Sequence, residues 1–174
     1  MCSLSETAKR HASAAIIDSQ SVKSTETSDE RGYDAGKKVN GRKRHILVDT
    51  IGLLLMVMVL PANIQDRDGG KQLLAAFLSQ VTPSRIKHIW ADGGYAGTLL
   101  AWARKWWHCT VEIVKRSELH IFKILPRRWV VERTFGWLGR YRRLSRDYER
   151  QATTGEIMVY LAMIRLMLAR LGRI

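Results

Sequence analysis

The order of apolar runs along the chain is the feature that most restricts its fold. Three strand-like runs come first, at residues 14–18, 44–49 and 53–60. Two more, at residues 85–91 and 109–114, then alternate with helical patterns. Strands that follow one another directly can pair as hairpins, whereas strands separated by helices pair in parallel. The order therefore predicts an α/β fold, with a mixed five-stranded sheet and helices on both faces.

Four segments have the spacing of amphipathic helices. They are residues 66–78, 99–107, 127–141 and 156–171. Asp66 and Asp68 are candidate N-caps of the first helix. In the last helix, large apolar side chains recur along one side, and these are Ile157, Leu161, Ile164, Leu168 and Leu171. Residues 1–14 are expected to form a short extension, and residues 15–174 a single domain.

The charge of the chain is unusual for a small domain. Its 29 Lys and Arg face only 16 Asp and Glu, which gives a formal net charge of +13. Such a surplus attracts polyanions, of which nucleic acid is the commonest and an anionic membrane is the main rival. The most apolar run, residues 51–60, is about half as long as a membrane span, and Arg165 and Arg170 interrupt the C-terminal apolar segment. We therefore expect a cytoplasmic, nucleoid-associated protein without a membrane partner.

Two basic clusters are candidate DNA contacts. The first is expected in a loop before the second strand and comprises Lys37, Lys38, Arg42, Lys43 and Arg44. The second surrounds Glu132, and the expected contacts there are Arg128, Arg133, Arg140, Arg142 and Arg143. Lysine and arginine bind phosphate oxygens with little sequence preference. A solvated charged face is the alternative, but the excess of arginine around Glu132 favours DNA contact.

Three acidic residues are candidate metal ligands. Asp18 follows Ile16 and Ile17 at the expected end of a strand, and Asp92 follows the apolar residues 89–91. The carboxyl ends of strands are where open sheets place ligands. Glu132 lies among apolar neighbours on the basic helix. Carboxylates suit Mg²⁺ or Mn²⁺, and two such ions about 4 Å apart support phosphoryl transfer. A turn, a helix cap or a surface ion pair explains each acid equally well. Their spacing alone therefore does not decide between metal ligands and ordinary structural residues.

Longer motifs add a family resemblance. The segments IIDSQSVK (16–23), RGYDAGKKVNGRKRHILVDT (31–50), QDRDG (65–69), WADGGYAG (90–97) and LPRRWVVERTFGWLGRYRRLSRDYE (125–149) resemble DDE transposases of insertion sequence family five. The resemblance implies an RNase H-like catalytic fold. It also implies that Asp18, Asp92 and Glu132 are the catalytic, metal-binding triad.

The chain departs from related transposases at two places. Their signature around the glutamate has Tyr and Lys where this chain has Leu125 and Gly139, although Arg128 and Glu132 match. Family members also begin with a DNA-binding segment that this chain lacks before its first strand. The resemblance therefore implies a downstream-frame product or a truncated copy, and an upstream-frame product could supply the DNA-binding segment.

The function expected from the resemblance is metal-dependent cleavage at insertion-sequence ends and transfer of the 3′-hydroxyl into target DNA. Double-stranded DNA is the expected partner, and a homodimer is expected in the DNA complex. Two alternatives remain open. One is an inactive or partial transposase that only binds DNA or a partner, and the other is a stand-alone RNase H-like nuclease.

Overall fold

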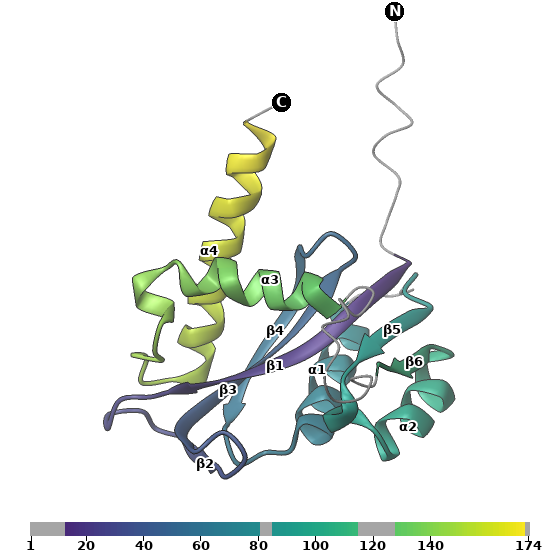
Figure 1. Ribbon diagram of the computed structural model, residues 1–174, viewed down its shortest axis with the longest axis horizontal. Helices are drawn as coiled ribbons and strands as arrows, with labels where there is room; N and C mark the ends of the chain where they lie inside the picture. Colours follow the sequence, from purple (N-terminus) through teal and green to yellow (C-terminus); the bar gives the residue numbers. More distant parts are fainter. Residues whose placement is uncertain (1–12, 81–84, 115–127, 173–174) are drawn as a thin grey trace, which may run out of the picture.

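The computed structural model describes residues 13–80, 85–114 and 128–172. The expected extension, residues 1–14, therefore lies almost entirely outside the described residues. In chain order the elements are β1 (Ala14–Lys23), β2 (Gly32–Asp34), β3 (Val39–Asp49), β4 (Leu54–Pro61), α1 (Asp66–Gln80), β5 (His88–Ala91), the 3₁₀ turn η2 (Gly93–Tyr95), α2 (Thr98–Trp107), β6 (Thr110–Ile113), α3 (Arg128–Gly139), the 3₁₀ turn η3 (Arg142–Leu144) and α4 (Ala152–Leu171). Figure 1 shows them around one sheet.

The sheet is mixed, with β1 at its centre. β3 pairs with β1 and with β4 in antiparallel fashion, whereas β5 pairs with β1, and β6 with β5, in parallel. The short strand β2 pairs with the beginning of β3, so the sheet has six strands where five were expected. The extra strand lies within the stretch that the sequence indicated as a loop. The α/β class expected of an RNase H-like domain is confirmed.

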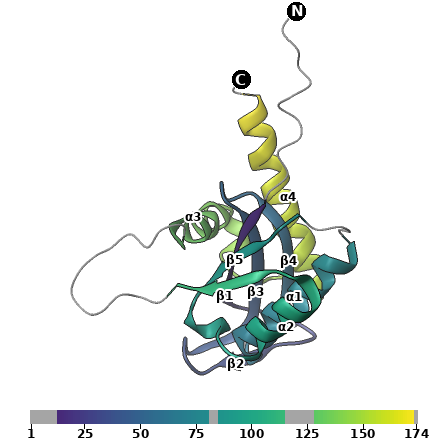
Figure 2. The same ribbon diagram turned by 90° about the vertical axis from the view of Figure 1, so that its right-hand side faces the viewer.

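Helices cover both faces of the sheet, and each face has its own core (Figures 1 and 2). On one face, α1 and α2 bury Leu73, Phe77 and Leu99 against the odd-numbered β1 residues Ala15 and Ile17. On the other face, α3 and α4 pack against Ile16 through a second group, which includes Val130, Val131, Leu138, Val159 and Met163. The period-two alternation of β1 assigns Ile16 to one core and its neighbours Ala15 and Ile17 to the other.

Helix α4 also closes the outer edge of β4. The backbone N–H of Val59 donates to Glu156 Oε1 at 2.8 Å, and that of Val57 donates to Tyr160 Oη at 3.3 Å. Burial raises the pKa of Glu156, and the hydrogen bond from Val59 only partly offsets that effect. Side chains of α4 thus satisfy backbone donors that an exposed edge strand would offer to another chain.

Strands β1 and β3 are longer than their sequence patterns predicted. Pairing continues from Ala15–Asp49 to Lys23–Gly41, so Asp18 lies near the middle of β1 instead of at its end. Residues 42 and 43, expected in a loop, belong to β3. The reason is that Arg42 and Arg44 are buried together with their charges, and no hydrophobic pattern reveals a buried guanidinium.

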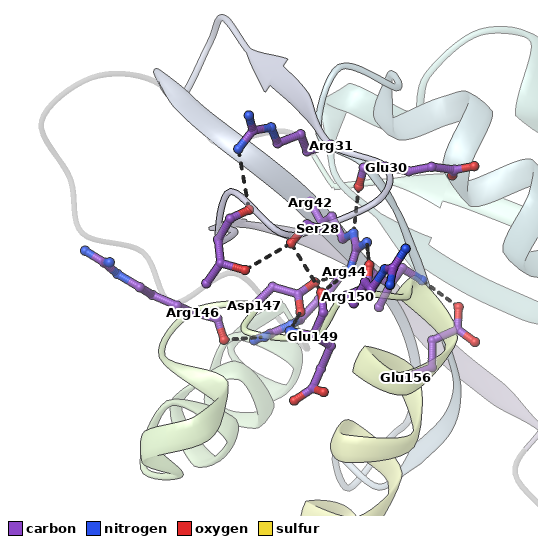
Figure 3. A network of polar contacts seen from close by, with 12 residues as sticks. Ser28, Glu30, Arg31, Arg42, Arg44, Arg146, Asp147, Glu149, Arg150 and Glu156 are labelled. Atoms are coloured by element: carbon purple, nitrogen blue, oxygen red, sulfur yellow. Dashed lines mark hydrogen bonds and ion pairs between the residues drawn. The ribbon is translucent and has the colours of Figure 1, made fainter.

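Arg42 ties the far end of β3 to the segment between η3 and α4, as Figure 3 shows. Its side chain is fully buried and donates to Asp147 Oδ2 at 3.3 Å and to the carbonyl oxygens of Glu30, Glu149 and Arg150. Arg44, 1% exposed, donates to the carbonyl oxygens of Leu144 and Arg146. Backbone carbonyls thus compensate most of the positive charge buried here.

We predict that Arg42→Met destabilises the protein by roughly 3 kcal/mol, because it removes the buried charged donor that Asp147 and three carbonyl groups share. Lys38→Met, at an exposed position of the β2–β3 turn, is the control and should change the free energy of unfolding by less than about 0.5 kcal/mol. Urea unfolding followed by circular dichroism measures both. Equal stability of the two variants would contradict the structural role of Arg42.

Candidate active site

The register of β1 and β5 brings Asp18 and Asp92 to the same level of the sheet. The parallel pairs are Ala14–His88, Ala15–Ile89 and Ile16–Trp90. Two residues further along each strand are Asp18 and Asp92. β5 ends at Ala91 while β1 continues to Lys23, so Asp92 begins the turn beside the open stretch of β1. This is the carboxyl edge of two parallel strands, where α/β sheets place ligands.

Asp92 is fixed at the start of η2. Its side chain accepts a hydrogen bond from the backbone N–H of Gly94 at 2.9 Å and so caps the 3₁₀ turn. A Cβ at Gly94 would lie 3.0 Å from Asp66 Oδ2 and 3.1 Å from Asp92 Oδ1. The two carboxylates therefore approach the same point, and only glycine leaves room between them.

Asp66 belongs to a buried polar cluster beside Asp18. Ser19 Oγ donates to Asp66 Oδ1 at 2.8 Å, and Lys43 Nζ lies 3.0 Å from the same oxygen. Burial raises the pKa of Asp66, but the hydrogen bonds from Lys43 and Ser19 outweigh it and hold the pKa below its usual value. Asp34 lies 3.6 Å from Lys43 Nζ on the other side. Sequence reasoning took Asp66 only for a helix cap, because its partners come from β1 and β3.

Tyr95 lies beneath the carboxylates. Its side chain is fully buried, and burial, followed by the charges of Asp18, Asp66 and Asp92, raises its pKa well above the usual value. The phenol therefore stays neutral, and it lies 3.4 Å from His45 Nδ1.

Glu132 lies on α3, on the same face of the sheet as the Asp18 side chain. α3 packs against β1 through Val130 and Val131, in the core that also contains Ile16. Asp18 has the same parity as Ile16 along β1 and points to that face. Glu132 follows the two valines and is exposed. The register therefore brings Asp18 and Asp92 to one level of the sheet, and Glu132 lies on the helix that packs against the same face of β1.

The expected convergence of three carboxylates into a ready metal site is not present within residues 13–80, 85–114 and 128–172. Glu132 is exposed on α3. The donor chemistry nevertheless fits Mg²⁺ or Mn²⁺, because Asp18, Asp92 and Glu132 offer only the hard oxygen ligands that these ions prefer. The assignment of these three residues as metal ligands stays a prediction.

The structure divides the predicted DNA-binding residues into buried and exposed groups. Arg42, Lys43 and Arg44 are buried and bind groups inside the protein, so the prediction of an exposed basic run there is wrong for these three. The exposed members are Lys37, Lys38, Arg140, Arg142 and Arg143. Lys37 Nζ donates to the carbonyl oxygen of Ser19 at 3.4 Å, next to Asp18. Leu125 and the side chain of Arg128 lie outside the described residues.

Arg133 is held within a stack of aromatic and basic side chains along α3. Its guanidinium carbon lies 4.3 Å from the ring centre of Trp129 and 4.7 Å from that of Trp137. Its Nη2 also donates to the carbonyl oxygen of Ile51 at 2.8 Å, in the β3–β4 turn. The two ring contacts are cation–π interactions, and the hydrogen bond connects α3 to the β3–β4 turn. Arg133 thus positions α3 against the sheet, which sequence reasoning did not anticipate.

Comparison with known proteins gives the family of the chain. Residues 9–167 match the family described as "Transposase DDE domain". A protein of Burkholderia cepacia, assigned as a transposase for insertion sequence element IS402, is 32% identical over 117 residues, which are 64% of this chain and 56% of that protein. The chain therefore spans about half the length of this relative. The catalytic core domain of BIV integrase superposes with a TM-score of 0.47 at 13% identity, covering 88% of this chain and 82% of that one.

The fold and the site define an α/β domain with acidic residues at the carboxyl edge of two parallel strands. The match over residues 9–167 covers most of the chain, and the chain belongs to the transposase DDE domain family. The recognition of a DDE transposase from its motifs is confirmed.

A pH-dependent stability follows from His45. The pKa of His45 is lowered to about 4, mainly by burial and also by the nearby charge of Lys43. The charge of Asp66 acts in the opposite direction. The unfolded chain binds a proton near pH 6.5 and the folded protein does not, so stability is fully present above pH 6.5 and is lost as the pH falls toward 4. We predict a loss of up to about 3 kcal/mol over this range.

Urea unfolding between pH 7 and pH 4.5 measures this loss. His45→Gln should remove most of the pH dependence, because glutamine does not titrate. His108→Gln, at the exposed C-terminus of α2, is the matched control and should leave the pH dependence of stability unchanged. A wild-type stability that stays constant between pH 7 and pH 4.5 would contradict the assignment.

Proposed function

We propose that this transposase domain cleaves DNA at insertion-sequence ends and joins the freed 3′-hydroxyl to target DNA, with Asp18, Asp92 and Glu132 as its catalytic carboxylates. The main support is the β1–β5 register, which brings Asp18 and Asp92 together at the carboxyl edge of the sheet. Membership of the family supports the reaction class. Placement in insertion sequence family five remains part of the proposal.

In the proposed site, a different element of the fold positions each of the three carboxylates. Asp18 sits on the central strand, where its pairing with Ile46 of β3 limits its movement. Asp92 is held by the Gly94 N–H, and Glu132 approaches from α3. Bound Mg²⁺ or Mn²⁺, in two copies, would activate the attacking oxygen and stabilise the leaving one. The protein residues position the phosphate and the ions, and the displacement needs no covalent enzyme intermediate.

We further propose that DNA lies over the face formed by α3, η3 and the β2–β3 turn. Arg142 and Arg143 line a hollow of about 440 Å³ together with Tyr148. A second hollow of about 510 Å³ lies between α3 and α4, and the described residues that line it include Arg140, Arg165 and Arg170 but no carboxylate. Guanidinium groups are suited to phosphate oxygens. That of Arg143 also pairs with Glu149 Oε1 at 2.9 Å, so a phosphate there would share it with that carboxylate.

The proposal extends to partners that the resemblance implies. The DNA complex would contain transposon ends and target DNA, with two copies of the chain. An upstream-frame product would supply the DNA-binding segment, since the chain spans 56% of its relative. The protein would act in the cytoplasm, associated with the nucleoid.

We predict that Asp18→Asn, Asp92→Asn or Glu132→Gln each lowers Mg²⁺-dependent DNA cleavage by at least about 100-fold. The substrate is a duplex carrying the inverted repeats that flank the coding sequence, and the readout is free and joined ends on a gel. Asp68→Asn, at an exposed position of the first turn of α1, should keep full activity.

The same variants should fold, because each replaces an acid with an amide of similar shape. Asn at position 18 or 92 should leave the melting temperature nearly unchanged, and at position 92 its side-chain oxygen can still accept from the Gly94 N–H. Cleavage by a folded Asp18→Asn variant at the wild-type rate would refute the catalytic assignment. Free ends without joined products would favour the stand-alone nuclease.

We also predict that Arg140→Gln combined with Arg142→Gln weakens DNA binding and lowers the salt dependence. The slope of log K against log salt should fall by about 0.9 for each lost phosphate contact. Fluorescence anisotropy between low and moderate salt measures it. Lys71→Gln lies on α1, on the other face of the sheet, and should leave the slope unchanged. An unchanged slope in the double variant would remove α3 and η3 from the DNA-binding face.

A further inference from the structure

The C-terminal helix α4 carries an apolar stripe that the domain leaves in solvent. The stripe consists of Ile157, Leu161, Ile164, Leu168 and Leu171, which are between 47% and 65% exposed. The buried side of α4, with Val159, Ala162 and Met163, faces the sheet. The stripe lies on the opposite side of the helix, and the C-terminal half of α4 extends beyond the sheet (Figures 1 and 2).

The spacing of the stripe is that of a coiled-coil seam. Its residues follow one another at intervals of four, three, four and three, which is the repeat of the a and d positions in a heptad. A helix that only packs against its own sheet needs no second apolar face of this kind. Ile164 is the central member, so pairing two copies of the stripe in either orientation places Ile164 near its own counterpart.

The area of the stripe is sufficient for a specific contact. Four of the five residues are more than half exposed. Pairing two stripes would remove on the order of 1,000 Å² of surface from water, which is near the lower end for stable protein interfaces. Met158 and Met167, partly buried beside the stripe, can add to the contact.

The charges of α4 do not oppose such pairing. The guanidinium of Arg165 lies over the ring of Tyr141, at 5.6 Å from its centre, and Arg170 lies over Trp137 at 4.3 Å. Both arginines are thus directed toward α3 and its following residues. The stripe itself contains no charged residue, so two copies can meet although each chain carries a net charge of +13.

We propose that the α4 stripe pairs with the same stripe of a second copy, so that the chain forms a dimer before DNA is bound. A lipid bilayer is a weaker fit. By length and composition α4 is the one helix of the described residues that could cross a membrane, but Arg165 and Arg170 would then have to enter the hydrocarbon region. A second copy supplies an identical, uncharged heptad seam and requires no such cost.

Analytical ultracentrifugation of the full chain without DNA tests the pairing. The wild type should be a dimer at about 100 µM and dissociate on dilution. The double variant Leu161→Gln, Leu168→Gln should weaken the dimer by at least about tenfold, because it places amides in the seam. Ala169→Gln adds the same polar group to an exposed position of α4 outside the stripe and should change dissociation by less than about twofold.

Cysteine cross-linking tests the geometry in a Cys2→Ser background. Ile164→Cys should form a covalent dimer rapidly, whereas Ala169→Cys, on the same helix, should not. Cys109 does not interfere, because it is 1% exposed and burial raises its pKa to about 11. All these measurements are made without DNA, so their outcome does not depend on whether the catalytic assignment is correct.

Three results would overturn the proposal. The first is a wild-type chain that stays monomeric at about 100 µM, which would mean that something other than a second copy covers the stripe. The second is a dimer that the Leu161→Gln, Leu168→Gln variant leaves intact. The third is a monomer that binds vesicles of neutral phosphatidylcholine through α4, which would identify lipid as the occupant.

Discussion

Parallel pairing of β1 with β5 is the contact on which the candidate active site depends. Three backbone pairs, ending at Ile16 and Trp90, set the level at which β5 stops and Asp92 begins its turn. A slip by one residue would turn Asp18 toward the α1 face and separate it from α3. The register is secured from both faces, because Ile16 and Trp90 pack in one core while Ala15 and Ile89 pack in the other. The packing of the sheet therefore determines where the acids lie.

The chain uses its large positive charge in two different ways. Some guanidinium groups are structural: Arg42 and Arg44 bind backbone carbonyls inside the fold, and Arg133 is held between two tryptophan rings. Others, such as Arg140 and Arg142, are exposed near α3. Net charge alone cannot separate these groups. The proposed DNA-binding face is consequently smaller than the sequence clusters indicated, and it is concentrated on α3, η3 and the β2–β3 turn.

Much of the fold could be predicted from the sequence, for identifiable reasons. Apolar runs such as Leu54–Leu60 and the helical spacing of Leu73, Leu74 and Phe77 reflect burial directly, and the structure has β4 and α1 there. Polar stretches that form strands were not predicted from the sequence. β2 and the first half of β3 contain few apolar residues. They form strands because β3 pairs with β1, β2 pairs with β3, and Arg42 is buried beside them.

The candidate site was predictable only in part. Asp18 and Asp92 each follow an apolar run, a pattern visible along the chain, and the register of β1 and β5 brings them to the same level of the sheet. Asp66, Lys43 and Tyr95 were missed as members of the same cluster, since their contacts join β3, α1 and η2 across the fold. Nothing in the spacing of these residues reveals that proximity. Long-range polar contacts of this kind become visible only when the strands are assembled.

Direct observation of a bound cation is the sharpest test of the account. Substoichiometric Mn²⁺ broadens the NMR signals of nearby backbone amides, and it can be added to the protein without DNA. The β1–β5 register predicts selective broadening around Asp18 and around Asp92–Tyr95, which Asp18→Asn should abolish. Broadening centred on other acidic residues, with the signals around Asp18 and Asp92 unaffected, would contradict the proposed metal site.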